Sequence, residues 1–337
     1  MAPVFRLSTF IYLLTSRSKQ VTVKVFNGFD SILEIKNPVL TIGTFDGVHI
    51  GHQKIIERLN EEAVKIDGES VLFTFYPHPR MVLFPEGHGL KLIQTQAEKI
   101  EKLRKCGLQN VIVFPFTKEF SRLTAIEFVR DYLVNKLNVK KLVIGYDHQF
   151  GKNREGSLEF LKDISETYGY EVIEIPAQDI DEVNVSSTKI RNALLNGDVE
   201  TANSFLGECF ELTGTVVKGN QIGTELGFPT ANIQVNSELK LIPGNGVYAV
   251  KVRLEDGSLV NGMLNIGTRP TIETTQYIRI EVHLFDTSLD LYGQNLTVRF
   301  LKRVRDEKRF EDKESLINQL KNDEITVRNI FLLVHND

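Results

Sequence analysis

The stretch Thr41-Ile-Gly-Thr-Phe-Asp-Gly-Val-His-Ile-Gly-His52 marks the point where a short apolar strand changes into a helix. Residues 39–42 are apolar or β-branched, and two glycines interrupt the pattern after them. Beyond the second glycine, four apolar residues recur with the spacing of one helical face: Ile55, Ile56, Leu59 and Ala63. The stretch therefore predicts a strand, a glycine turn and a helix whose opening turn carries His49 and His52.

The two histidines suit a phosphate site. They are three residues apart, so they share one face of the predicted helix. The first turn of a helix leaves backbone N–H groups unpaired at the positive end of the dipole, and imidazoles there can donate hydrogen bonds to phosphate oxygens in a transition state. Zinc binding is one alternative, but no third ligand follows at a metal-like spacing. Surface histidines without a role are the other alternative.

Around this stretch, strands and helices alternate as far as residue 206. The expected strands cover residues 23–26, 39–42, 71–76, 111–114, 142–145 and 171–175. Further helices are expected at 95–105, at 124–135 after a capping box, and at 157–168. This alternation predicts an α/β, Rossmann-like parallel sheet with helices on both faces, which binds ligands at the carboxyl ends of its strands.

Two polar clusters follow strands of the predicted sheet. One is the loop 145–156, and the other is Val185-Ser-Ser-Thr-Lys-Ile-Arg191, which opens a helix. The hydroxyl side chains of the second cluster are typical of helix N-caps, and capping alone explains them. A cap does not need Lys189 and Arg191, because cations are unfavourable at a helix N-terminus. Bound polyphosphate would resolve that conflict, so we favour a phosphate site.

After Gly207 the pattern changes to strands alone. Period-2 runs cover residues 210–217, 231–235, 246–254, 259–266, 278–285 and 296–304. They predict a six-stranded antiparallel β-barrel, and Asp312 can cap a C-terminal helix that packs on it. The expected anchors of that helix are Leu316, Ile317 and Leu320. The chain is therefore divided into domains at 21–206 and 207–337.

Two stretches of the second half carry chemistry. In Gly227-Phe-Pro-Thr-Ala-Asn232, the side chains of Thr230 and Asn232 face the same way on a predicted strand and can both coordinate one hard cation. Further on, the carboxylate of Glu281 can take the proton from an attacking hydroxyl. A turn that begins a strand and a solvent-facing glutamate are the simpler alternatives.

The composition narrows the class of protein. The chain has 337 residues, 42% hydrophobic and 25% charged, as expected for a globular protein of two domains. The net charge of −4 argues against a nucleic-acid partner, and no segment reaches transmembrane length, so no membrane partner is expected. Two distant cysteines, Cys106 and Cys209, favour a reducing, cytoplasmic location. Residues 1–20 have no acidic residue; their composition allows a transit or signal peptide, but we favour a disordered leader or a start codon assigned too far upstream.

The motifs of the first half resemble those of nucleotidylyltransferases, in the form carried by FAD synthetases. They are T-x-G-T-F-D-G-V-H-x-G-H at 41–52, G-x-D-x-x-F-G at 145–151 and S-S-T-x-I-R at 186–191. The resemblance implies that His49 and His52 hold the ATP phosphates while the α-phosphate is attacked. It also implies an ATP-binding set of Gly43, Thr44, Phe45, Asp46, Asp147, Ser187, Thr188 and Arg191. Residues 114–123 resemble the flavin-side wall, although a hydrophobic strand end explains them equally well.

The second half resembles riboflavin kinases. The matching motifs, in order, are P-T-A-N at 229–232 and the segments 265–270, 281–284 and 290–293. The resemblance implies that Thr230 and Asn232 hold Mg²⁺ and that Glu281 is the base. One departure is Thr224, which stands where the family usually has Arg or Lys; this can weaken ATP binding unless Lys218 compensates.

Together the two resemblances imply a bifunctional enzyme of FAD biosynthesis. Residues 207–337 would phosphorylate riboflavin to FMN with ATP, and residues 21–206 would adenylylate FMN to FAD and release pyrophosphate. ATP, riboflavin and FMN would be the substrates, and the oligomeric state stays open. Two alternatives remain: a nucleotidylyltransferase for another phosphorylated acceptor, and a flavin-binding protein with an inactive kinase half, which Thr224 suggests.

Overall fold

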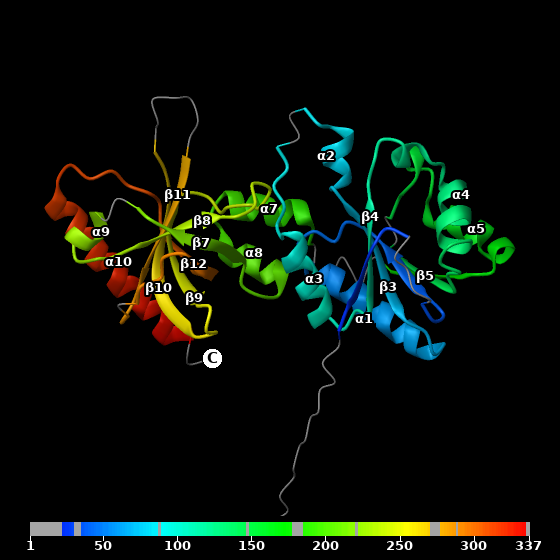
Figure 1. The fold of residues 1–337 in the computed structure, drawn as a ribbon, viewed down its shortest axis with the longest axis horizontal. Coiled ribbons are helices and arrows are strands. Elements are labelled where there is room, and N and C mark those ends of the chain that lie inside the picture. The colour runs from blue at the N-terminus through cyan, green and yellow to red at the C-terminus, as the bar shows by residue number, and fades with distance from the viewer. Residues whose placement is uncertain are drawn as a thin grey trace, which may run out of the picture.

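The structure, a computed structural model, describes residues 22–29, 35–86, 89–145, 148–176, 185–219, 222–269, 277–287 and 289–334. The expected leader, residues 1–20, and the expected ATP ligand Asp147 lie outside these ranges. Figure 1 shows two lobes: an α/β domain formed by the first half of the chain and a barrel formed by the second.

The first lobe contains a six-stranded parallel sheet in the order β1-β4-β3-β2-β5-β6. Its strands are β1 (Lys24–Asn27), β2 (Val39–Ile42), β3 (Ser70–Tyr76), β4 (Asn110–Pro115), β5 (Lys141–Gly145) and β6 (Glu171–Ile175). Each lies within one residue of its predicted range, so this part of the prediction is confirmed. Because β3 lies on one side of β2 and β5 on the other, ligands are expected beyond the carboxyl ends of β2 and β5.

Helices cover both faces of this sheet (Figure 1). They are α1 (Ile50–Lys65), α3 (Gln96–Lys105), α4 (Ala125–Phe128) and α5 (Leu158–Tyr168), whereas the short helix α2 (Pro79–Leu83) follows β3 and buries no residue. Alternate residues of each strand point to opposite faces: Leu72 packs in the cluster formed with α1 and α3, and Phe73 in the cluster formed with α4 and α5. The capping box at Thr124 is confirmed, but the helix after it is α-helical only to Phe128 and π-helical over Val129–Val134.

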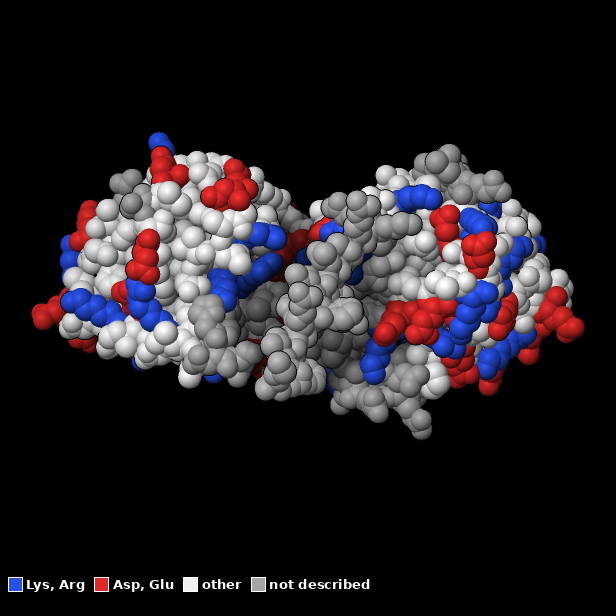
Figure 2. Space-filling model, turned by 90° about the horizontal axis from the view of Figure 1, so that it is seen from below, with Lys and Arg blue, Asp and Glu red and all other residues white. Residues whose placement is uncertain are grey.

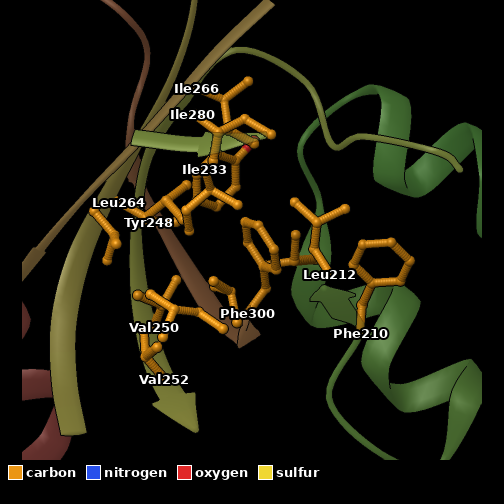
Figure 3. Close-up of a cluster of buried hydrophobic side chains, with 14 of the residues drawn as sticks. Phe210, Leu212, Ile233, Tyr248, Val250, Val252, Leu264, Ile266, Ile280 and Phe300 are labelled. Carbon is orange, nitrogen blue, oxygen red and sulfur yellow. The ribbon is translucent and has the colours of Figure 1, made fainter. Parts of the chain in front are cut away.

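The second lobe is a closed antiparallel barrel in the order β10-β11-β8-β7-β12-β9. Its strands are β7 (Glu211–Val217), β8 (Ala231–Val235), β9 (Gly246–Arg253), β10 (Leu259–Arg269), β11 (Tyr277–Leu284) and β12 (Asn295–Arg305). Apolar side chains at alternate positions fill the interior, among them Val250, Leu264 and Phe300 (Figure 3). The predicted six-stranded barrel is confirmed, although β10 continues beyond its expected end at Ile266.

The C-terminal helix α10 (Lys313–Val334) lies against the outside of the barrel (Figure 1). Asp312 caps its start, as predicted, because Oδ1 accepts a hydrogen bond from the N–H of Ser315 at 2.7 Å. The helix packs on the barrel through Leu320, Val327 and Phe331. All three expected anchors, Leu316, Ile317 and Leu320, are half-buried, and Leu316 and Leu320 line a cavity.

Two further helices, α7 (Ser187–Leu195) and α8 (Val199–Leu206), lie between the lobes (Figure 1). Their buried side chains belong to the same cluster as the barrel interior: Ile190, Leu194, Val199, Ala202 and Leu206. The side-chain amide of Gln53 on α1 donates hydrogen bonds to the carbonyls of Val48 and Leu206, both at 2.9 Å. The two lobes are therefore in direct contact, and the domain boundary between residues 206 and 207 stays a prediction.

Charge is spread over the molecule. On the face shown in Figure 2, acidic and basic side chains occur on both lobes. This mixture agrees with the small net charge of −4. Within the ranges that the structure describes, no helix combines the length and the apolar character needed to cross a membrane.

Candidate active sites

The turn after β2 carries the first candidate site. Gly47 has a φ of 90°, a left-handed conformation that glycine adopts without a steric penalty. Phe45 and Val48 also have positive φ values, 49° and 36°, so surrounding contacts must hold the turn in this strained form. Helix α1 begins at Ile50, and His49 is its N-cap rather than part of its first turn as expected. The reason is that Nδ1 of His49 accepts a hydrogen bond from the N–H of His52, at 3.3 Å.

Three rings stack at the start of α1. His52 stacks on His49 with ring centroids 3.6 Å apart, and on Phe45 with centroids 4.4 Å apart. Burial lowers the pKa of His49 to about 4, although Asp46 opposes the shift, and burial also lowers the pKa of His52 well below its ordinary value. Both imidazoles are therefore neutral at pH 7. Because Nδ1 of His49 accepts a hydrogen bond, its proton lies on Nε2, which stays available as a donor.

These rings open on a cavity of about 880 Å³ beyond the carboxyl ends of β2 and β5. The cavity brings together six of the predicted site residues: Gly43, Thr44, Phe45, His49, His52 and Ser187. Nδ1 of His52 is buried and has no hydrogen-bond partner among the described residues. The position of the cavity agrees with the ligand site that the strand order predicts.

One end of the cavity is aromatic. It is lined by Phe75, Phe116, Phe120, Phe128 and Phe150. Phe116 and Phe120 belong to the segment 114–123, so this segment does face the cavity, and Phe120 packs on several rings around it. An aromatic end next to a polar helix N-terminus suits a ligand that combines a planar ring with phosphate.

Three other predicted residues of the first site, Asp46, Thr188 and Arg191, lie outside the cavity lining. The buried carboxylate of Asp46 accepts hydrogen bonds from the backbone N–H groups of residues 93 and 94 and from Nη2 of Arg191, the last at 2.6 Å. The charge of Arg191 is thus balanced within the protein, and it does not by itself require bound polyphosphate. Ser187 donates from Oγ to the carbonyl of Asp46, and Thr188 is exposed.

Lys99 is a residue of this site that the sequence analysis missed. Its ammonium group is buried and donates hydrogen bonds to the carbonyl of Thr44 at 3.2 Å and to Oγ1 of Thr74 at 3.1 Å. Burial lowers the pKa of Lys99 to about 8, against an opposing effect of Asp46. The available signal was its position four residues before Leu103, on the buried face of α3, where a lysine is unusual.

Two histidines whose pKa values are lowered, His49 and His78, predict a pH dependence of stability. Burial lowers the pKa of both His49 and His78 from 6.5 to about 4. Between these values the unfolded chain binds more protons than the folded chain, so the free energy of unfolding should fall as the pH is lowered from about 6.5 to 4. Urea unfolding at several pH values measures this slope. His49→Gln should make the free energy of unfolding depend less steeply on pH. An unchanged pH dependence in that variant would contradict the lowered pKa of His49.

The second candidate site lies on the outer face of the barrel. In β11, Ile280 and Val282 point into the barrel core, so Glu281 between them points outward. The register places Glu281 directly opposite Asn232 of β8 and Asn265 of β10. These three polar side chains therefore form a row across neighbouring strands on one face of the wall.

A cavity of about 350 Å³ lies over this row, between the barrel wall and α10. Two of the three predicted kinase residues, Thr230 and Glu281, line it. Asn232 is not part of the lining; its side chain lies over Gly219, where an added Cβ would come within 2.0 Å of the amide nitrogen. Gly219 is therefore required for Asn232 to occupy the position opposite Glu281.

Two contacts fix the polar groups of this second cavity. Nδ1 of His283 lies 2.7 Å from the carbonyl oxygen of Pro229, which ties the segment before β8 to β11. Nη1 of Arg279 lies 3.4 Å from the carboxylate of Glu281, and both side chains remain partly exposed. The cavity therefore presents a carboxylate with a neighbouring cation and a hydroxyl, which suits proton removal beside a charged ligand.

Comparisons with known proteins match each half of the chain to a different family. The FAD synthetase family model matches residues 32–189, and the riboflavin kinase family model matches residues 206–331. The bifunctional riboflavin kinase/FMN adenylyltransferase of Buchnera aphidicola subsp. Acyrthosiphon pisum is 35% identical over 316 residues, which are 93% of this chain and 100% of that protein. The protein of the same name from Haemophilus influenzae is 38% identical over 292 residues, 87% of this chain and 94% of that protein. A solved structure, titled as a macrolide-efflux protein from Streptococcus pneumoniae, has a TM-score of 0.83 and 33% identity, covering 91% of this chain and 99% of that one.

Proposed function

The chain belongs to the family of bifunctional riboflavin kinases/FMN adenylyltransferases, and from this premise we propose which cavity performs which reaction. The substrates of the two activities are ATP, riboflavin and FMN. We assign adenylyl transfer to the cavity at His49 and His52, and riboflavin phosphorylation to the cavity at Glu281. FMN is then the product of the second site and the acceptor at the first.

The adenylyl-transfer assignment rests on one observation: the stacked histidines line the same cavity as the aromatic side chains of its aromatic end, which we call the aromatic wall. In the reaction, a phosphate oxygen of FMN attacks the α-phosphorus of ATP, the bond to the β-phosphate breaks, and pyrophosphate leaves. Phe116 and Phe120 would contact the flavin ring. The free N–H groups at the start of α1 and the Nε2–H of His49 would bind phosphate oxygens, where charge increases in the transition state.

In the kinase site, the 5′-hydroxyl of riboflavin attacks the γ-phosphorus of ATP, and ADP leaves. Glu281 would take the proton of that hydroxyl, because it is the carboxylate of the polar row that faces the cavity. Arg279 beside it would keep the carboxylate oriented. The rate enhancement then comes mainly from positioning and from stabilising negative charge, as in other phosphoryl transfers.

We propose Mg²⁺ as the cofactor of the kinase site. The Thr230 hydroxyl and the Asn232 amide are oxygen donors, which Mg²⁺ prefers, and Asn232 lies opposite Glu281. In the part of the chain that the structure describes, no group of three or more His, Cys, Asp and Glu side chains could hold a metal ion. Thr230 and Asn232 would therefore share the ion with the ATP phosphates. When bound, Mg²⁺ neutralises phosphate charge.

A cytoplasmic location is also part of the proposal. Cys106 and Cys209 are both free, as thiols are in a reducing compartment. Burial raises the pKa of each thiol, so neither is activated as a nucleophile.

A product assay tests the function as a whole. The purified protein is incubated with riboflavin, ATP and Mg²⁺, and the flavins are separated by chromatography. We expect FMN to appear first and FAD to follow, with pyrophosphate released as FAD forms. If riboflavin bound but stayed unphosphorylated, the flavin-binding alternative would be favoured. If FMN formed but was not converted, an adenylyltransferase for another acceptor would be favoured.

A further inference from the structure

A short segment between α2 and α3, residues 90–95, contacts both lobes; we call it the bridging segment. Leu92 pairs with Lys240 of the barrel lobe in a parallel β-bridge. The N–H of Leu92 donates to the carbonyl of Leu239 at 2.7 Å, and the N–H of Leu241 donates to the carbonyl of Leu92 at 2.8 Å. The bridging segment is therefore attached to the barrel lobe through its backbone.

The other side of the bridging segment holds the turn of the first active site. The N–H groups of Ile93 and Gln94 donate to the two carboxylate oxygens of Asp46, at 3.1 and 3.2 Å. The side chain of Ile93 is fully buried in the barrel-lobe cluster, yet it also contacts Gly47, where an added Cβ would lie 3.0 Å from its Cδ1. One residue thus touches both the barrel core and the turn that precedes His49.

Lys240 fixes this arrangement from the barrel side. Its side chain is only 2% exposed. Its Nζ donates to the carbonyl of Ile93 at 2.9 Å and to the carboxylate of Glu98 at 2.6 Å, and it lies 4.6 Å from the ring centroid of Phe210. The same carboxylate accepts a hydrogen bond from the N–H of Thr95 and so caps α3. One ammonium group therefore orders the bridging segment and the start of the following helix.

An ion pair with a buried ammonium group is a poor source of stability, because removing that charge from water offsets much of the attraction to the partly exposed carboxylate of Glu98. An apolar side chain would fill the same space. What an ammonium group adds is direction, since it fixes the position of the Ile93 carbonyl. The strained turn between Phe45 and Val48 needs fixed surroundings of this kind, because positive φ values are unfavourable for residues other than glycine.

We propose that Lys240, on the barrel lobe, is a positioning residue for adenylyl transfer in the other lobe. It holds the bridging segment, and the bridging segment holds Asp46 and Gly47 in the turn that places His49. The inference rests on the proposed assignment of adenylyl transfer to the histidine cavity. It makes FAD formation depend on a kinase-lobe side chain that does not line the kinase cavity.

The test is Lys240→Met in the full-length protein, with both activities measured in the same sample. We expect kcat for FAD formation from FMN to fall by about 10- to 100-fold, because small misplacements of catalytic groups cost this much. The KM for FMN should change by less than about threefold, because the aromatic wall does not include the bridging segment. The rate of riboflavin phosphorylation should stay within about twofold.

Two further variants separate positioning from loss of folded protein. Lys240→Met combined with Glu98→Gln removes both charges, so no carboxylate is left unpaired in the interior; it should keep the low kcat for FAD formation. Lys91→Met is the control, because it also replaces a lysine that joins the bridging segment to the barrel lobe, but one at the surface. Nζ of Lys91 donates to the carbonyl of Glu238 at 2.6 Å, and the substitution should leave both activities unchanged. Because the proposed function gives FMN a site in each lobe, FMN-binding stoichiometry, measured by fluorescence quenching, reports intact sites in every variant relative to the two sites expected per wild-type chain.

Normal FMN-binding stoichiometry with a reduced kcat for FAD formation supports the inference. Wild-type FAD formation in the double variant would overturn it, as would a loss of FAD formation that only matches a loss of FMN-binding sites. An equal fall of both activities would also overturn it. These outcomes are distinct from failure of the proposed function, in which the wild-type protein itself would form no FAD from FMN.

Discussion

Replacing His49 by alanine is expected to lower FAD formation from FMN by about 10²- to 10³-fold, while riboflavin phosphorylation stays within about twofold of the wild-type rate. The substitution removes the Nε2–H donor from the lining of the 880 Å³ cavity. It does not touch the kinase cavity, which is lined by residues of the barrel lobe alone. The loss should appear mainly in kcat, because the donor binds phosphate oxygens most strongly when their charge increases.

His49 also caps α1, so a second variant is needed to separate its two roles. Serine is a favourable N-cap residue but lacks the imidazole. His49→Ser should therefore restore the stability that His49→Ala loses, with no recovery of FAD formation. Chromatography of reactions started with riboflavin and with FMN measures both activities. Recovery of FAD formation in His49→Ser would show that only the cap matters, and loss of both activities in a folded variant would refute the two-site assignment.

Much of the fold could be predicted because both lobes follow simple periodic patterns. Strand β3 alternates between the two faces of the sheet, with Leu72 on one side and Phe73 on the other. The barrel strands show the same period of two, and glycine ends α8 at Gly207 with a φ of 72°. The least accurate part was the helix after Thr124, where a π-helical turn replaces the expected α-helix. Hydrophobic spacing does not distinguish these two helix types.

The sites were predicted less completely than the fold, because several of their contacts join distant parts of the chain. Local chemistry identified His49 and His52, which the structure places on one cavity with four other residues of the expected set. It could not show that the carboxylate of Asp46 would accept hydrogen bonds from Arg191 and from the bridging segment. For Lys99 the only signal was its position on the buried face of α3, and for Lys240 there was none, because a lysine is normally exposed.

The two proposed active sites make opposite use of electrostatics. The first surrounds its histidines with apolar and aromatic groups, and burial is the main reason that the pKa values of His49 and His52 are low. The second keeps Glu281 partly exposed next to Arg279, on the outer face of a barrel wall. Neutral donors suit the first proposed reaction, which needs no proton acceptor from the protein, whereas the second needs a carboxylate that can accept a proton.

Replacing Glu281 by alanine is accordingly expected to lower riboflavin phosphorylation by about 10²- to 10⁴-fold, with FMN adenylylation kept within about twofold of wild type. Glu281→Gln is the sharper variant. It preserves the size of the side chain and a hydrogen-bond acceptor for Arg279, yet it cannot take a proton from the riboflavin hydroxyl. Both variants should therefore lose kinase activity to a similar extent.

The comparison with Asn265 provides the control, because this residue lies in the same row directly opposite Glu281 but carries no ionisable group. Asn265→Ala should reduce phosphorylation less than Glu281→Gln does, since it removes a polar contact and leaves the base in place. Initial rates of FMN formation at saturating ATP measure the difference. If Glu281→Gln kept substantial kinase activity while Asn265→Ala lost it, the row would act by binding substrate, and the proton would have to leave the hydroxyl without help from this carboxylate.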